Sequence, residues 1–113
     1  MLLPNADEAE IDPEKLRGYL LSTEHPHGRF KARFFRALGF RAARWEELES
    51  ALRTQHLTQE AERLAVANKG QKFKIRAILV GPDGESAVAV SIWFVRPGET
   101  VPRFVTAYPG GRP

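Results

Sequence analysis

The stretch that decides the fold is residues 72–95, which read KFKIRAILVGPDGESAVAVSIWFV. Two runs rich in β-branched and other apolar residues, 73–80 and 87–95, flank the sequence GPDG at 81–84. Runs of this composition on either side of a Gly/Pro/Asp turn are typical of a β-hairpin. We therefore expect two antiparallel strands here.

Pairing Val80 with Glu85 across a four-residue turn defines the expected register of the hairpin. A second turn at 97–100 adds a strand at 102–108 and places Trp93 opposite Phe104. In this register one face is apolar and takes the helices. The side chains expected on the opposite, free face are Lys72, Lys74, Arg76, Ser91, Trp93, Thr106 and Tyr108. If either turn is one residue longer or shorter than expected, these side chains point toward the helices instead.

Such a free face combines cations, hydroxyls and aromatic rings, which suits the binding of a phosphodiester with stacked bases. An ordinary polar outer face of a sheet is the alternative, because Lys, Thr and Tyr are also common there.

The first half of the chain is expected to be helical. Asp12 followed by Pro13 is a typical helix start, and Gly39 is well placed to end a later helix. The expected elements are helices at 12–21, 29–38 and 42–55, a weak strand candidate at 61–67, and strands at 73–80, 87–95 and 102–108. This order predicts an α+β fold, with about three N-terminal helices packed on one face of a twisted antiparallel sheet of three to four strands.

Length and composition limit the class of protein. With 113 residues the chain supports one core, so we expect a single domain at 1–108 and a flexible tail at 109–113. The absence of cysteine excludes a disulfide scaffold, a thiolate zinc site and a cysteine nucleophile. No apolar run approaches the roughly 20 residues that span a bilayer, and the N-terminus lacks a signal-peptide pattern. We therefore expect a cytoplasmic protein with no membrane partner.

The positive charge is concentrated rather than spread. The formal net charge is only +3, yet residues 29–44 contain no acid. The basic residues of this stripe are Arg29, Lys31, Arg33, Arg36, Arg41 and Arg44. A local basic stripe is the pattern expected for a phosphate-rich partner, and a solvated helix face is the alternative.

Two histidines lie close together in a loop, where His25 and His27 flank Pro26. Histidine is the usual proton-transfer group near neutral pH, and loops commonly carry it. Because Pro26 pushes the rings apart and no third ligand lies nearby, we expect no metal site. His56, at the end of the third helix, is expected to be a cation that interacts with the helix dipole.

The remaining polar clusters carry no recognised cofactor motif. Three acids near the start of the third helix are expected to stabilise that helix; they are Glu46, Glu47 and Glu49. No Gly-rich phosphate loop is present, so we expect no nucleotide or other cofactor. RNA cleavage needs little more than loop histidines and cations, because the 2′-hydroxyl of RNA is itself the nucleophile.

Several segments carry a resemblance that covers nearly the whole chain. They are LPNAD (3–7), IDPEKL (11–16), HPHGRFKARFF (25–35), GPDG (81–84), SIW (91–93), PGE (97–99) and VPRFVTAYP (101–109). Together they resemble a family of small stand-alone bacterial proteins. That family is similar to the C-terminal ribonuclease domains of contact-dependent inhibition and other polymorphic toxins. Those domains belong to a broad group with barnase-like, colicin-type and RelE-like RNases.

The resemblance implies a metal-independent endoribonuclease that acts on RNA, with transfer RNA as one candidate. It implies that His25 is the general base or acid, that Lys31 stabilises the phosphorane, and that Thr106 and Tyr108 hold the scissile phosphate. His27 is the alternative proton-transfer group, since it lies in the same loop. The resemblance also implies a small cognate antitoxin or immunity protein as partner. A stand-alone chain of this kind is an intracellular toxin or a relative that has lost activity.

The residues expected to grip the RNA backbone are Arg29, Lys72, Lys74 and Arg76. Trp93 is expected either to stack on a base or to be buried between sheet and helix. Two rival hypotheses remain open. One is a non-catalytic RNA-binding module, and the other is a protein-interaction module whose basic stripe docks on an acidic protein. The sequence does not determine the oligomeric state.

Overall fold

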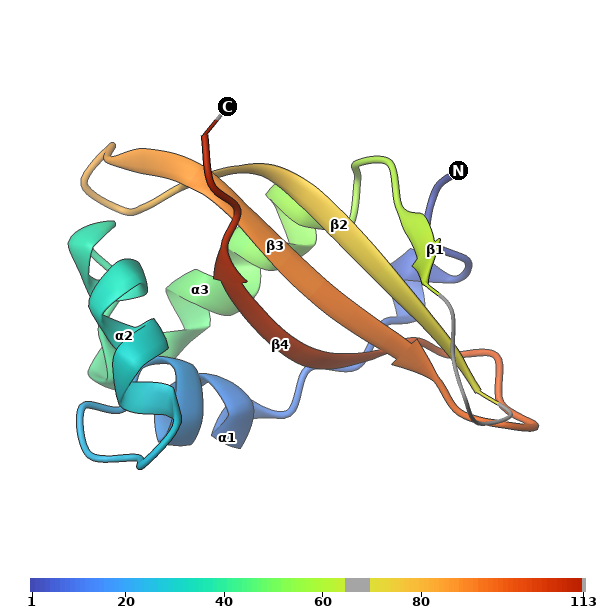
Figure 1. Ribbon diagram of the computed structural model, residues 1–113, viewed down its shortest axis with the longest axis horizontal. Coiled ribbons are helices and arrows are strands. Elements are labelled where there is room, and N and C mark those ends of the chain that lie inside the picture. The colour runs from blue at the N-terminus through green and yellow to red at the C-terminus, as the bar shows by residue number, and fades with distance from the viewer. Residues whose placement is uncertain (65–69, 113) are drawn as a thin grey trace.

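The computed structural model in Figure 1 shows an open, four-stranded antiparallel sheet with helices beside it. It describes residues 1–64 and 70–112. The sheet order β1-β2-β3-β4 follows the chain. The strands are β1 (Glu62–Leu64), β2 (Gln71–Val80), β3 (Ser86–Val95) and β4 (Arg103–Pro109). Of the weak strand candidate at 61–67, residues 65–67 lie outside the described part of the chain.

The three expected helices are present, although two of them change their winding. The helical elements are the 3₁₀ turn η1 (Ala6–Glu8), α1 (Pro13–Lys15), the π-helical turn η2 (Leu16–Leu20), α2 (Gly28–Ala37), the 3₁₀ turn η3 (Ala42–Arg44), α3 (Trp45–Ala51) and the π-helical turn η4 (Leu52–His56). The Asp12 side chain accepts from the Glu14 N–H at 3.0 Å, as expected of an N-cap. Gly39 follows α2 with φ of +99°, a conformation that glycine adopts without strain. The α+β prediction is confirmed.

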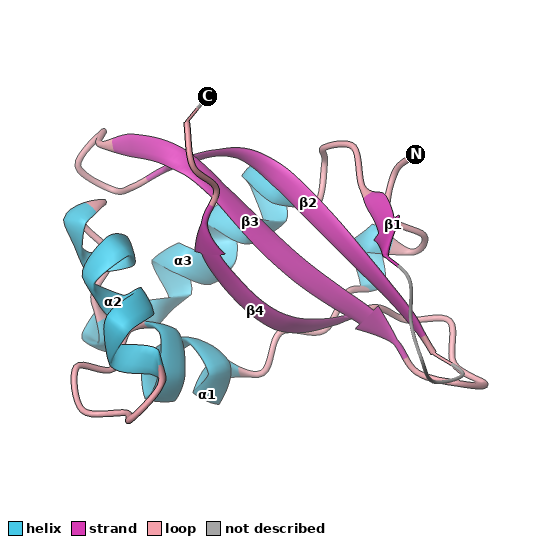
Figure 2. Cartoon of the chain, viewed as in Figure 1, coloured by secondary structure: helices cyan, strands magenta, loops and turns pink. Residues whose placement is uncertain are grey.

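The helices cover the sheet at one face and at one edge. Figure 2 shows α3 crossing the sheet, and its continuation η4 packs against β2, while α2 lies beside the edge strand β4. The side chains buried between these layers include Leu16, Leu20, Phe35, Leu48, Leu52, Phe73, Ile75, Leu79 and Trp93. Within the described residues, no helix combines the length and the apolar character that crossing a bilayer requires.

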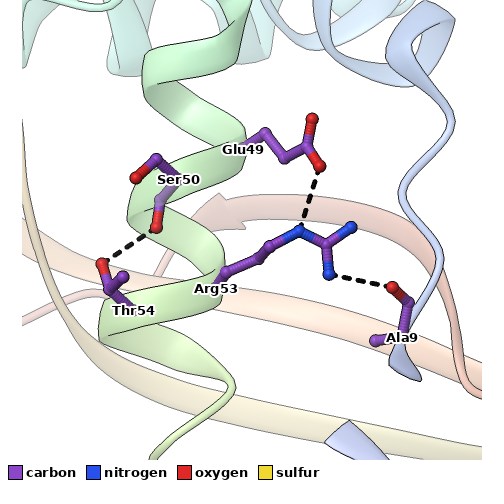
Figure 3. Close-up of polar contacts among 5 residues, drawn as sticks. All are labelled: Ala9, Glu49, Ser50, Arg53 and Thr54. Carbon is purple, nitrogen blue, oxygen red and sulfur yellow. Dashed lines mark hydrogen bonds and ion pairs between the residues drawn. The ribbon is translucent and has the colours of Figure 1, made fainter. Parts of the chain in front are cut away.

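Arg53 ties the N-terminal segment to α3 and η4 (Figure 3). Its Nε donates to a Glu49 carboxylate oxygen at 3.0 Å, and its Nη1 donates to the Ala9 carbonyl at 2.9 Å. On the same helix the Thr54 hydroxyl donates to the Ser50 carbonyl at 2.9 Å (Figure 3). Glu46 and Glu47 lie in the first turn of α3, whereas Glu49 lies beyond that turn and pairs with Arg53.

The hairpin register differs by one residue from the predicted one. Val80 pairs with Ser86 rather than Glu85, because the loop is one residue longer than expected. The Gly81 N–H donates to the Glu85 carbonyl at 2.8 Å and closes that loop. The slip turns Ser91 and Trp93 toward the helices, and both are fully buried. The prediction that these two side chains lie on the free face is therefore wrong, and burial of the large indole ring favours the observed register.

A β-bulge on the other side of β3 offsets this slip. Trp93 pairs with Phe104 as predicted, but the register then shifts so that Ile92 pairs with Thr106. Val105 is the extra residue in β4. As a result the side chains of Lys72, Lys74, Arg76, Thr106 and Tyr108 still share the free face, now with Phe94.

His56 corrects a second expectation, because it is a buried part of the core and not a solvent-exposed helix-end cation. Its Nε2 lies 3.2 Å from the Ala77 carbonyl, and its Nδ1 lies 2.8 Å from the Ser91 hydroxyl, which also accepts from Trp93 Nε1 at 2.9 Å. A carbonyl accepts only, so Nε2 carries the proton and the Ser91 hydroxyl donates to Nδ1. Burial lowers the pKa of His56. The ring is neutral because η4 packs onto β2 instead of ending in solvent.

The buried His56 is expected to make the protein less stable in mild acid. Its pKa is lowered in the folded state, so the unfolded chain binds more protons and stability falls as the pH drops below the unfolded value of about 6.5. Between pH 7.5 and 5.5 the loss contributed by this group is up to about 1.4 kcal/mol. Urea unfolding at both pH values measures it, and His56→Gln is expected to remove this part of the pH dependence. An unchanged dependence in the variant would contradict the assignment.

Candidate functional site

A pocket of about 580 Å³ lies where the N-terminal helices meet the edge strand β4. Its lining residues are Glu14, Lys15, Gly18, Tyr19, His25, Lys31, Val105 and Thr106. They come from α1, η2, the loop before α2, α2 itself and β4. The pocket therefore brings together three residues of the expected catalytic set, His25, Lys31 and Thr106.

Lys31 is at the centre of the polar groups in this pocket. Its Nζ donates to the Tyr19 hydroxyl at 2.9 Å and to the Thr106 hydroxyl at 2.9 Å. Because both oxygens accept from Lys31, each hydroxyl hydrogen is left to donate to another group, and the ammonium keeps a third N–H. We call Tyr19, Lys31 and Thr106 the donor cluster. Several donors around one cation suit an anion with several oxygen atoms.

His25 borders the donor cluster and adds one more donor. Its Nδ1 accepts from the backbone N–H groups of His27 and Gly28, both at 3.0 Å. A nitrogen that accepts hydrogen bonds carries no proton, so the proton of the neutral ring is on Nε2. Among the residues that the structure describes, Nε2 has no hydrogen-bond partner. The ring lies edge-on to Tyr19, with 4.9 Å between the centroids.

His27 does not line the pocket and is exposed. Its centroid lies 6.0 Å from that of His25. Of the two histidines that the sequence leaves open, the geometry therefore favours His25.

Tyr19 is a site residue that sequence reasoning missed. At its position it belongs to the apolar stripe of the first helix, and a tyrosine at that spacing is ordinarily a core residue. Only its tertiary contacts with Lys31 and Thr106 distinguish Tyr19 from an ordinary core tyrosine. The hydrogen bond from Lys31 lowers the pKa of the Tyr19 hydroxyl, although burial opposes this shift. Tyr19 also lies in the π-helical turn η2, a feature often found at functional sites.

Gly28 allows α2 to begin directly against η2. A Cβ at this position would lie 2.1 Å from the Tyr19 carbonyl oxygen, which is well inside van der Waals contact. This close approach brings Lys31, one turn further along α2, to the Tyr19 hydroxyl.

Gly28→Ala is expected to lower the free energy of unfolding by about 1–3 kcal/mol, because a backbone atom must move to admit the methyl group. Gly18→Ala is the matched control, since its Cβ meets only the flexible Glu14 carboxylate, at 2.7 Å. Urea unfolding of both variants measures the difference. Equal free energies of unfolding for Gly28→Ala and Gly18→Ala would contradict this prediction, because they would mean that α2 can move away from η2 at no energetic cost.

The other predicted site residues lie outside this pocket. Tyr108 is two residues beyond Thr106 on the same face of β4, a spacing of about 7 Å along the strand. Arg29 and Lys72 are exposed. Trp93 is fully buried and packs edge-to-face on Phe104.

Two of the predicted RNA-binding cations already have partners. Lys74 pairs with Glu62 at 3.3 Å. Arg76 Nε donates to the Gly110 carbonyl at 3.0 Å, and its guanidinium also contacts the Arg112 carbonyl. The C-terminal residues thus lie over the free face at Arg76, and among the described residues Lys72 is the cation of β2 with the fewest partners.

Comparison with known proteins gives a structural neighbour and a family. No curated protein matches the sequence. The fold is similar to that of a chain in a contact-dependent growth inhibition toxin–immunity protein complex from Klebsiella pneumoniae 342, with a TM-score of 0.59. The two chains are 18% identical, and the similarity covers 89% of this chain and 99% of the other. The family model matches residues 2–111, and the chain therefore belongs to the family described as domain of unknown function (DUF6883).

Proposed function

We propose that the chain is a metal-independent endoribonuclease of a bacterial toxin type. The observation that carries this proposal is the donor cluster, in which Lys31 is hydrogen-bonded to Tyr19 and Thr106 beside His25. A phosphodiester offers the oxygen acceptors that such a cluster needs. RNA brings its own nucleophile, so a site of this kind acts on RNA and not on DNA.

In the proposed reaction the 2′-oxygen attacks the adjacent phosphorus, and the bond from phosphorus to the 5′-oxygen breaks. The products are a 2′,3′-cyclic phosphate and a 5′-hydroxyl end. Negative charge builds up on the phosphorane oxygens, where Lys31 and Thr106 donate hydrogen bonds. Such stabilisation of developing charge is usually the largest single contribution to catalysis. Tyr108, next along the same face of β4, holds another oxygen of the phosphate.

The proton steps are assigned to Tyr19 and His25. The contact with Lys31 lowers the pKa of Tyr19, so its phenolate is more accessible as the acceptor of the 2′-hydroxyl proton. His25 donates a hydrogen bond from Nε2, the nitrogen without a backbone partner, to the leaving 5′-oxygen, and that oxygen takes its proton from water. Arg29, Lys72, Lys74 and Arg76 are proposed to hold the RNA backbone, which makes binding sensitive to salt.

The fold similarity to a chain of a toxin–immunity complex supports a protein partner as well. We propose a small antitoxin or immunity protein that covers the pocket. That complex contains both a toxin and an immunity protein, so a partner-binding module is the competing function. The donor cluster favours the enzyme, because a protein that only binds a partner has no need of a pocket lined with anion donors.

The proposal is tested by incubating the protein with total transfer RNA in excess EDTA. Wild type is expected to cleave the RNA, and both His25→Ala and Thr106→Ala are expected to lose cleavage. Thr58→Ala is the matched control, because this exposed hydroxyl donates only to the Thr54 carbonyl at 3.0 Å. RNA that stays intact at every enzyme concentration contradicts the proposal. Salt-dependent binding without cleavage, unchanged in His25→Ala, would instead support an RNA-binding module.

Tyr19→Phe is expected to slow cleavage and to change its dependence on pH. In wild type the rate should rise with pH up to the lowered pKa of Tyr19, because the phenolate is the form that accepts a proton. Initial rates of RNA cleavage, measured from about pH 6 to about pH 10, cover the pH interval in which the Tyr19 hydroxyl is expected to ionise. Removal of the hydroxyl should abolish that rise. A variant that keeps the wild-type profile would exclude Tyr19 as the base.

A further inference from the structure

A second pocket, of about 470 Å³, adjoins the first along β4. Lys15 and Val105 line both pockets, so the two meet at these residues. The second pocket is also lined by Phe94, Arg96, Arg103, Glu10 and Asp12. We propose that it binds the nucleotide next to the scissile phosphate in a single strand of RNA. The inference rests on the proposed function, because it takes RNA as the ligand.

Lys15 provides a cation at the junction of the two pockets. Its Nζ donates to the Val105 carbonyl at 3.3 Å, which leaves two further N–H groups of the ammonium. Val105 is the bulged residue of β4, so the bulge that keeps Thr106 on the free face also places this contact. A strand with its phosphate at Lys31 would pass Lys15 with the next part of its backbone.

Phe94 supplies an aromatic wall to the second pocket. It lies on the free face of β3, opposite Lys72 on one side and Arg103 on the other. Through the one-residue register slip it takes the place that the sequence predicted for Trp93. A partly exposed ring between cations is the usual platform on which a base stacks in single-stranded nucleic acid.

The charged groups around Phe94 match a nucleotide rather than a simple anion. Among the described residues Arg96 enters no ion pair, so its guanidinium is available to a phosphate or a base edge. Arg103 is held by Glu10 at 2.9 Å and by Glu99 at 3.4 Å. The carboxylates of Glu10 and Asp12 can accept from the amino groups of a base. An acidic peptide would face these same carboxylates and would gain nothing specific from the aromatic wall.

The test uses a fluorescent tetranucleotide with 2′-O-methyl sugars, which binds without being cleaved because its 2′-oxygens cannot attack. Fluorescence anisotropy measures its affinity for wild type, Phe94→Leu and Arg96→Gln. Phe94→Leu is expected to weaken binding about tenfold, the typical effect of losing one stacked base. Arg96→Gln is expected to weaken binding and to reduce the slope of affinity against salt by about one contact. Inorganic phosphate, which has no base to stack on an aromatic ring, should bind wild type and Phe94→Leu equally.

Arg33→Gln is the matched control, because it removes the same charge from α2 at a position that lines neither pocket. Equal affinity for the tetranucleotide in wild type, Phe94→Leu, Arg96→Gln and Arg33→Gln would overturn the inference, whatever the cleavage assay shows. Loss of affinity in Phe94→Leu and Arg96→Gln alone supports it, even if the wild type cleaves no RNA. The failure of the proposed function and the failure of the second pocket are therefore separate results.

Discussion

Replacement of Lys31 by methionine is expected to lower the rate of RNA cleavage about 10²- to 10³-fold, the usual cost of removing one donor to a developing oxyanion. Lys31 donates to both Tyr19 and Thr106, so its loss removes a charge and also frees two hydroxyls from their fixed positions. Methionine is an unbranched side chain of similar length that carries no charge. Initial rates at saturating RNA separate this effect from weaker binding.

The control for Lys31→Met is Arg33→Met, which removes a positive charge from the exposed side of the same helix. Urea unfolding of both variants shows whether the helix remains packed. If Lys31→Met retains cleavage within about threefold of wild type, well short of the expected loss, the donor cluster is not the catalytic centre.

Trp93→Ala is expected to cost about 3–5 kcal/mol of stability, the range for truncating a large buried aromatic residue. The indole is fully buried, its ring centroid lies 5.2 Å from that of Phe104, and its Nε1 donates to Ser91. This loss is a large share of the total, because the free energy of unfolding of domains of this size is only about 5–15 kcal/mol. Urea unfolding near neutral pH measures the change.

Trp93→Phe separates the two roles that the sequence leaves open for this residue. It keeps an aromatic ring in the core and removes the hydrogen bond to Ser91, so we expect a smaller loss of about 1–3 kcal/mol. Binding of the 2′-O-methyl tetranucleotide should be unchanged, in contrast to Phe94→Leu. A Trp93→Phe variant that folds normally but binds the tetranucleotide as weakly as Phe94→Leu would indicate that Trp93 contacts the RNA.

Local signals in the sequence were sufficient for the elements but not for the register. The Asp12 cap and the glycine at position 39 act within one turn of chain, so the helix ends could be predicted. In β3, by contrast, both faces are largely apolar, so alternation does not indicate which side points inward. The length of the loop at 81–85 decides the register, and within that loop the Gly81 N–H donates to the Glu85 carbonyl and the Gly84 N–H donates to the Gly81 carbonyl.

The candidate site could be predicted only in part for a similar reason. Lys31 and Thr106 were identified through the resemblance, and they meet because the bulge at Val105 offsets the slip of the hairpin. No local sequence pattern predicts that a bulge in one strand will offset a register shift in the neighbouring hairpin. Tyr19 could not be predicted, because a helical tyrosine in an apolar stripe is indistinguishable from a core residue until α2 is packed against it.

The central claim is that the pocket around Lys31 cleaves RNA by using the 2′-hydroxyl of the substrate. The most direct test compares an RNA oligonucleotide with its all-2′-deoxy counterpart, each incubated with wild type and with Lys31→Met in excess EDTA. We predict that wild type cleaves the RNA to a 2′,3′-cyclic phosphate end, leaves the deoxy strand intact, and loses this activity in Lys31→Met. RNA that remains intact at every concentration of wild type, or equal cleavage of both strands, would contradict the claim.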